Sequence, residues 1–247
     1  MNKAVTKFWL SVLLLLVWEA AARMHWVSAW MIVPPTRIPA AVAGLIASGD
    51  LATHLAATLQ RLTAAFVLGS GMGLALGLAG GLFRPLGQAL EPLVNLLNSV
   101  PKLTLLPLAI AIAGTGEISR AMPPLLSSFA IMTVHALDSV RAVEPRYAEL
   151  AASYGTSRLG MFRWVYLPSC LPRICTGIRL SLSIGLVMVV SVEMIGAHVG
   201  VGALIMLAGQ VLATERLYAA VVVCGLLGLA LTELLRWAER RLIPWES

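Results

Sequence analysis

The chain has 247 residues, of which 59% are apolar and only 12% charged, and its mean hydropathy is +0.86. This leaves too little polar surface to cover a water-soluble globule, so we expect an all-α, polytopic membrane protein. The net charge of +6 does not indicate a nucleic-acid ligand, because the 18 Lys and Arg residues are scattered between apolar stretches. No linker divides the chain, which predicts a single domain over residues 1–247.

Six apolar stretches are candidate membrane spans, because a helix needs about 20 mostly apolar residues to cross the hydrocarbon core. In chain order they cover residues 8–26, 62–83, 86–116, 121–137, 174–197 and 217–232. The second is the clearest, since it carries no charged residue. The third is the weakest, because Pro101 and Lys102 interrupt it, so it is either a full span or a re-entrant segment.

The first stretch has two interpretations. Lys3 and Lys7 precede it, and three alanines at 20–22 follow its apolar centre, as in a cleaved secretory signal. The apolar run continues past Glu19 toward Trp26, however, and several more spans follow. We therefore interpret it as an uncleaved first span.

The distribution of basic residues predicts the topology. With six spans and both termini in the cytoplasm, 12 Lys and Arg residues lie on the inner side and 5 on the outer side. A five-span arrangement would break this bias. Residues 31–61 then form an outer-face segment, in which Pro34, Pro35, Pro39, Gly49 and Asp50 punctuate two short helices outside the membrane.

Glycines recur every four residues along the second span, at Gly69, Gly73, Gly77 and Gly81. They form a bare ridge that another helix can approach closely. Gly177, Ser181 and Gly185 repeat the spacing on the fifth span. We expect helix packing at these two ridges, either inside the subunit or across a dimer.

Catalytic motifs are absent from the sequence. No lysine follows a glycine-rich phosphate loop, so the chain has no ATPase site, and it has no HExxH motif. The histidines (His25, His54, His135, His198) and the cysteines (Cys170, Cys175, Cys224) lack metal-ligand spacing. Ser70 and His135 could be imagined as an intramembrane protease pair, but nothing orders them. We expect no enzyme activity, no metal and no cofactor in this chain.

Two acidic residues fall inside predicted spans, where an unpaired carboxylate is costly. Glu19 can pair with Arg23 one helical turn later. Glu193 lies near the outer end of the fifth span, and it either reaches the water there or lines a translocation path.

The segment 141–172, between the fourth and fifth spans, is too polar to lie in lipid. Pro145 suits the first turn of a helix that ends at Gly155 as a left-handed cap. Thr156 or Ser157 can cap a second helix, which we expect to end at Pro168. Two short helices joined at a glycine would form a rigid knob at 143–168, either a docking element for a cytoplasmic protein or an ordinary structured loop.

The spacing inside the knob resembles the EAA loop of permease subunits of bacterial ATP-binding cassette importers. The pattern of that loop is E-A-A, three residues, G, nine residues, I-x-L-P. The matching residues here are Glu149, Leu150, Ala151, Gly155, Leu167 and Pro168, with Ala152 beside them. Leu150 replaces the first alanine of the pattern, and Val165 replaces its isoleucine.

The resemblance extends over nearly the whole chain and narrows to the sulfonate, taurine and nitrate permeases. It rests on Trp18-Glu19-Ala20-Ala21, Pro34-Pro35-Thr36, Ser48-Gly49-Asp50-Leu51, Pro101-Lys102-Leu103 through Leu106-Pro107-Leu108, Gly114-Thr115-Gly116-Glu117 and Glu193-Met194-Ile195-Gly196. It implies a type I importer permease fold in the bacterial inner membrane. The implied partners are a second permease copy, a cytoplasmic ATPase dimer that holds ATP and Mg²⁺, and an extracytoplasmic substrate-binding protein.

The implied solute is small and anionic, with sulfonates or taurine ahead of nitrate, bicarbonate or a vitamin precursor. The alternative is an ion-coupled secondary transporter or channel, which would explain the spans but not the loop spacing.

Overall fold

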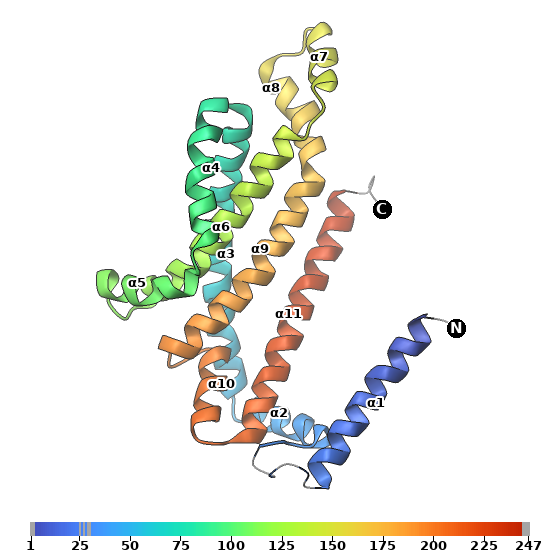
Figure 1. The fold of residues 1–247 in the computed structure, drawn as a ribbon, viewed down its shortest axis with the longest axis vertical. Helices are drawn as coiled ribbons and strands as arrows, with labels where there is room; N and C mark the ends of the chain where they lie inside the picture. The colour runs from blue at the N-terminus through green and yellow to red at the C-terminus, as the bar shows by residue number, and fades with distance from the viewer. Residues whose placement is uncertain (1–2, 25, 27, 29–30, 244–247) are drawn as a thin grey trace. The chain divides into compact units, whose positions relative to one another are not determined.

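The computed structural model describes residues 3–24, 26, 28 and 31–243. The described residues form helices and no strands (Figure 1). The elements are α1 (Lys3–Arg23), η1 (Pro35–Arg37), α2 (Ile38–Ala47), α3 (Asp50–Leu82), α4 (Arg84–Ser99), η2 (Lys102–Leu105), α5 (Leu106–Ala113), α6 (Glu117–Arg141), α7 (Pro145–Ser153), α8 (Arg158–Met161), η3 (Phe162–Tyr166), α9 (Leu167–Gly196), α10 (Val201–Gln210) and α11 (Thr214–Leu242). The predicted all-α fold class is confirmed.

The chain divides into two compact units. The first comprises Met1–Ala57 and Glu193–Leu227, and the second comprises Thr58–Val192 and Gly228–Ser247. Helices α3, α9 and α11 each contribute residues to both.

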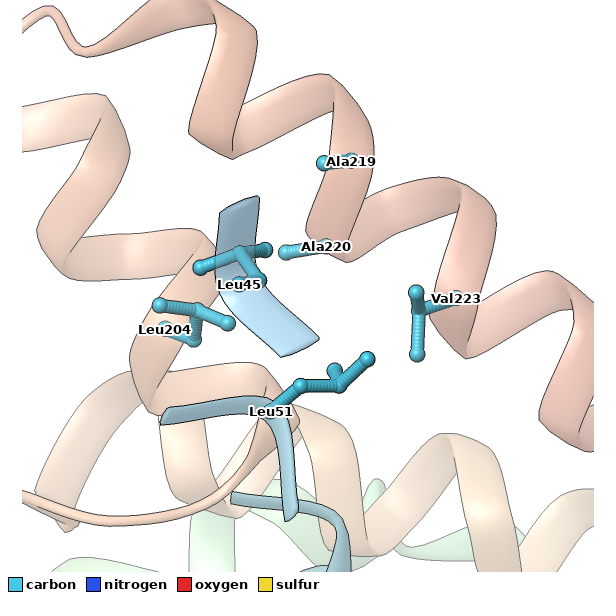
Figure 2. Packing of buried hydrophobic residues seen from close by; sticks show 6 residues of the cluster. All are labelled: Leu45, Leu51, Leu204, Ala219, Ala220 and Val223. Atoms are coloured by element: carbon cyan, nitrogen blue, oxygen red, sulfur yellow. The ribbon is translucent and has the colours of Figure 1, made fainter. Parts of the chain in front are cut away.

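The first unit is held together by an apolar core. Figure 2 shows Leu45 of α2 between Leu204 of α10 and Ala220 of α11, with Leu51 and Val223 beside them. Leu45 is 1% exposed and Ala220 is fully buried. Two ion pairs link the elements of this unit: Arg37 of η1 binds Glu215 of α11, and Arg216 of α11 binds Asp50 of α3. Burial of small and aliphatic side chains therefore fixes α2 and α10 against the first turns of α11.

The second unit is built on α6, which carries 12 buried residues. The glycine ridge of α3 packs directly on it. A Cβ at Gly69 would lie 2.5 Å from the Leu125 carbonyl oxygen, and a Cβ at Gly73 would lie 2.5 Å from that of Phe129. The ridge contact is therefore inside the subunit, and its partner is the fourth predicted span.

The fifth span also packs on α6. A Cβ at Gly177 would lie 2.7 Å from the His135 side chain. The Ser181 hydroxyl lies 2.8 Å from that of Ser70 and bonds to the Ser128 carbonyl oxygen at 3.4 Å. Helix α9 thus contacts both α6 and α3.

These contacts also give the helix directions inside the second unit. The residue numbers of the contacting pairs increase together along α3 and α6, from Gly69 with Leu125 to Gly81 with Val140. The two helices therefore run parallel. Arg141 of α6 pairs with Glu91 of α4, and Leu137 lies near Val94, so α4 runs antiparallel to α6. The chain alternates in direction through α3, α4, α6 and α9, as the six-span topology requires of these helices.

Three described helices are long and apolar enough to span a membrane: Asp50–Leu82, Arg158–Gly196 and Thr214–Arg241. A fourth span is possible through α4 and the η2–α5 segment, which are bent by 91° at their junction. α1 has 21 residues, about the length a span requires. The count of six stays a prediction.

Two features differ from the sequence-based expectations. The outer-face segment 31–61 holds only one separate α-helix, α2, because the stretch after Gly49 has no breaker and belongs to α3. The apolar helix α10 was not predicted. It follows the turn at Gly200, where φ is +140°, and its ten residues are too few for a span signal.

Candidate functional site

The first helix of the knob begins and ends as predicted. Pro145 occupies its first turn, where a missing N–H costs nothing. Helix α7 ends at Ser153, and Gly155 caps it in a left-handed conformation with a φ of +73°. The Thr156 N–H bonds to the Ala151 carbonyl at 3.1 Å, and the Gly155 N–H bonds to that of Ala152 at 2.9 Å. This is a Schellman cap, so the turn between the two knob helices is rigid.

The second helix starts at Ser157, whose Oγ accepts the Gly160 N–H at 3.2 Å. It does not end at Pro168, as the sequence predicted, but runs through η3 into α9. The reason is a π-turn: the Leu167 N–H bonds to the Phe162 carbonyl, five residues back. This wider turn accommodates Pro168, which has no N–H to donate. The knob is therefore continuous with a helix of 39 residues, Arg158–Gly196.

The predicted docking residues lie on the surface of the knob. No residue of α7 is buried, and Glu149, Ala152 and Gly155 are exposed. Ala151, Leu167 and Pro168 are half-buried. Leu150 is 57% exposed. Tyr147 and Tyr154, about one helical turn before and after it, are exposed as well, so Leu150 is part of a contiguous apolar surface.

An apolar groove of ≈ 310 Å³ lies between the two knob helices. Its lining residues are Tyr147, Leu150, Ala151, Tyr154, Trp164, Val165 and Ser169. Tyr154 and Trp164 are 82% and 73% exposed. The sequence interpretation missed the aromatic residues. The two tyrosines could have been found from the spacing 147, 150, 151 and 154, which is the i, i+3, i+4, i+7 stripe of an amphipathic helix, but Trp164 lies outside that stripe.

The other side of α7 faces a cavity of ≈ 670 Å³ inside the second unit. It is bounded by the end of α3, the start of α4, the end of α6 and the first turns of α7. Arg84, Arg141 and Glu149 all line it. The knob and the α3–α4 turn therefore lie at the same end of this unit, and that end is rich in arginine.

The predicted Glu19–Arg23 pair is present. Arg23 Nε lies 2.5 Å from Glu19 Oε1, and the Thr36 hydroxyl and backbone N–H donate to the same carboxylate at 2.8 and 3.1 Å. Glu19 thus anchors the segment before α2 to the end of α1.

Glu193, the predicted candidate for a translocation path, is fully buried within the first unit. Its Oε2 accepts the Gly202 N–H at 3.0 Å, in the first turn of α10. A path role stays a prediction, but the geometry shows this carboxylate bonded to the Gly202 backbone amide.

The sequence model of the family described as binding-protein-dependent transport system inner membrane component matches residues 69–245 of this chain. The chain belongs to this family. It is the permease subunit of an ATP-binding cassette importer, a multi-pass membrane protein, and permeases of this family are not catalytic. They work with an ATPase and a substrate-binding protein.

Two curated relatives cover nearly the full chain. A Bacillus subtilis protein described as an aliphatic sulfonates transport permease is 31% identical over 96% of this chain and 86% of its own length. The taurine transport system permease protein of Escherichia coli is 34% identical over 95% and 87%. The fold matches an inward-facing structure of the MetNI methionine ABC transporter, with a TM-score of 0.62, 18% identity, and coverage of 77% of this chain and 95% of that one.

The permease also presents a polar stripe along α9. Ser169, Thr176 and Ser183 recur every seven residues and are exposed, while Ser181 between them is fully buried. Each of the three exposed hydroxyls donates to the carbonyl four residues before it, at 2.7, 3.1 and 2.9 Å. Each of these hydroxyls is therefore satisfied within α9 and needs no partner outside the helix. The sequence interpretation did not single it out.

A charge cluster ties α3 of the permease to the start of α6. Arg61 donates to both Glu117 oxygens, at 2.7 and 2.9 Å, and Arg120 donates at 2.8 Å. The hydrogen bond from Arg61 lowers the pKa of the Glu117 carboxyl to about 2. Glu117 ends the Gly-x-Gly-Glu turn and precedes the apolar run of the fourth predicted span, so this pair fixes the helix where that run begins.

Proposed function

We propose that this permease forms the path for a small anionic solute and couples to its ATPase through the knob at 143–168. We propose further that it acts as a homodimer, with both termini in the cytoplasm. ATP and Mg²⁺ would bind only to the partner ATPase. The sulfonate and taurine permeases among its relatives support the choice of solute class.

The observation that carries the proposal is the exposed apolar face of a rigid knob. Tyr154, Trp164 and Leu159 are each more than 70% exposed, at 82%, 73% and 75%. Aromatic residues on a structured protrusion are typical of interface anchors. The Schellman cap at Gly155 holds the two helices in one geometry, which reduces the ordering cost of docking.

The charge of the knob end supports a cytoplasmic partner. Arg84 and Arg141 line the cavity beside α7, and Arg146, Arg158 and Arg163 lie on the knob itself. An excess of arginine marks the cytoplasmic side of a membrane protein. ATP is available on that side, so this is where an ATPase would dock.

The exposed hydroxyl stripe of α9 supports a place for the path. Thr176 and Ser183 satisfy their hydrogen bonds within the helix, so they can face solute without a strong binding site. We place the path along this stripe, closed on its other side by the second copy. Discrimination among anions would then rest mainly on the binding protein.

The decisive experiment compares two matched glycine substitutions. Gly155→Asp and Gly49→Asp each place a carboxylate at a left-handed position, at φ values of +73° and +76°. A Cβ at either position meets no atom within 4 Å, so the backbone strain is similar. We expect Gly155→Asp to abolish co-purification of the ATPase, while Gly49→Asp retains it. Retention of the ATPase by Gly155→Asp would refute the docking role.

A second experiment separates the importer from an ion-coupled transporter. The permease would be reconstituted in vesicles with and without its ATPase and binding protein. We expect taurine or sulfonate uptake only with both partners and ATP. Uptake by the chain alone under an ion gradient would refute the proposal that ATP hydrolysis by a partner drives transport through this subunit.

A further inference from the structure

We infer that Glu193 is a positioning residue, whose carboxylate locks α10 to the end of α9 and, through Gly200 and His54, to the start of α3. The inference rests in part on the proposed function, because transport is one of its readouts. All of these residues belong to the first unit.

The Glu193 carboxylate, at the end of α9, bonds to the first turn of α10. Glu193 Oε2 accepts the Gly202 N–H at 3.0 Å, and the side chain is fully buried. The first N–H groups of a helix have no partner within the helix, and the helix dipole favours a negative charge there. The Gly202 N–H and the helix dipole thus offset part of the cost of burying this acid.

Gly200 makes this contact possible. Its φ of +140° and ψ of 159° are open to glycine and strained for other residues. A Cβ at this position would overlap the Glu193 carboxyl group. The turn between α9 and α10 therefore wraps around the carboxylate, and only glycine leaves room for it.

His54 ties the same turn to α3. Its Nδ1 lies 3.0 Å from the Gly200 nitrogen and 2.8 Å from the Gly200 carbonyl oxygen, so it accepts from the former or donates to the latter. Three helices thus meet at one glycine: α9 through Glu193, α10 through Gly202 and α3 through His54. We call this set the Glu193 lock.

The lock lies at one end of the 39-residue helix that begins in the knob. Helix α9 follows the knob in the chain and ends at this turn, so we propose that a displacement of α9 is felt at the turn after Gly196. Only a firm contact there passes the displacement on to α10 and α3. In this view Glu193 transmits motion, and it does not bind solute.

The test compares Glu193→Gln with Glu193→Met in the full permease, with Glu215→Gln as the control at an exposed acid of the same unit. Glutamine keeps an oxygen that accepts the Gly202 N–H, whereas methionine has a similar length and no such acceptor. Amide hydrogen exchange at the start of α10 is measured in the purified permease. ATP-driven uptake is measured with the ATPase and binding protein.

We expect Glu193→Gln and Glu215→Gln to stay within about threefold of the unmodified protein in both measurements. Glu193→Met should raise exchange at the Gly202 amide about tenfold or more, as the loss of one buried hydrogen bond implies. The knob of this variant still docks on the ATPase, so ATP hydrolysis should continue. The solute taken up per ATP hydrolysed should fall about tenfold or more, because the motion no longer reaches α10 and α3.

Two results would overturn the inference. One is unchanged exchange and uptake in Glu193→Met. The other is loss of uptake in Glu193→Gln with exchange still protected, which would show that the charge acts directly on the solute. If Glu193→Met does not fold, the test rests on Glu193→Gln: uptake and protection that both stay near those of the unmodified protein support the inference, and loss of uptake with protected exchange overturns it. The exchange measurement needs no transport, so it stays valid even if the importer proposal fails.

Discussion

Replacement of Gly73 by alanine should destabilise the permease, because the α3–α6 contact leaves no room for a methyl group. A Cβ at Gly73 would lie 2.5 Å from the Phe129 carbonyl oxygen and 3.0 Å from the Met132 Cβ. Backbone atoms of a packed helix cannot move aside individually, so the two helices must separate. Gly71 is the matched control, two residues away in the same helix, where a Cβ meets nothing within 4 Å.

The expected magnitude follows from this comparison. Alanine gains about 1 kcal/mol of helix propensity over glycine at either position, and that gain cancels in the difference. What remains is overpacking, which costs about 1–3 kcal/mol. For a chain of this size each kcal/mol shifts Tm by roughly 2–4 °C. Gly73→Ala should therefore melt about 2–12 °C below Gly71→Ala.

The assay is thermal unfolding of the purified permease in one detergent, followed by circular dichroism at 222 nm and by size-exclusion chromatography. Equal melting temperatures for the two variants would refute the packing argument. A second refuting result is a Gly73→Ala protein with unchanged Tm that elutes as a smaller species. That outcome would place the ridge at an interface between two copies.

Three further predictions concern the second unit. The pKa of Glu117 is lowered, so its ion pair with Arg61 stabilises the fold above pH about 4.5 and is lost as pH falls toward 2. Because Glu117 is largely exposed, this is worth only about 1 kcal/mol, and Glu117→Gln should flatten that part of the stability curve. Ser183→Cys should react with a membrane-impermeant thiol reagent at least tenfold faster than Ser181→Cys, because Ser183 is exposed and Ser181 buried; equal rates would contradict the path assignment. Ser128→Ala should change the free energy of unfolding by less than about 1 kcal/mol, since its Oγ has no hydrogen-bond partner among the described residues; a larger loss in denaturant titration would reveal a bound water or ligand there.

Local signals in the sequence predicted the knob well. Pro145 marks the first turn of α7, and Gly155 forms the left-handed cap. Of the two proposed caps for the second helix, the structure selects Ser157. Each of these signals acts through hydrogen bonds that span five residues or fewer, so a pattern in the sequence contains all the information required.

The Pro168 prediction was wrong because it treated proline as a helix end. In the structure a π-turn shifts the hydrogen bonds upstream of Pro168, and the helix continues. The groove of Tyr147, Tyr154 and Trp164 was missed for a different reason. Its two walls come from helices on opposite sides of the Gly155 turn, and only the folded knob brings them together.

By itself the sequence determined that this is a membrane protein, that the chain is all helical, which stretches form its long apolar helices, and that a capped knob interrupts them. These follow from composition, hydropathy and short-range hydrogen bonding. Tertiary structure alone decided which helix covers the glycine ridge, that the turn at Gly200 encloses Glu193, and which hydroxyls of α9 remain exposed. The reason is that a bare ridge or a buried acid fits many partners equally well in a linear pattern, and the partner is selected only when whole helix surfaces pack against one another.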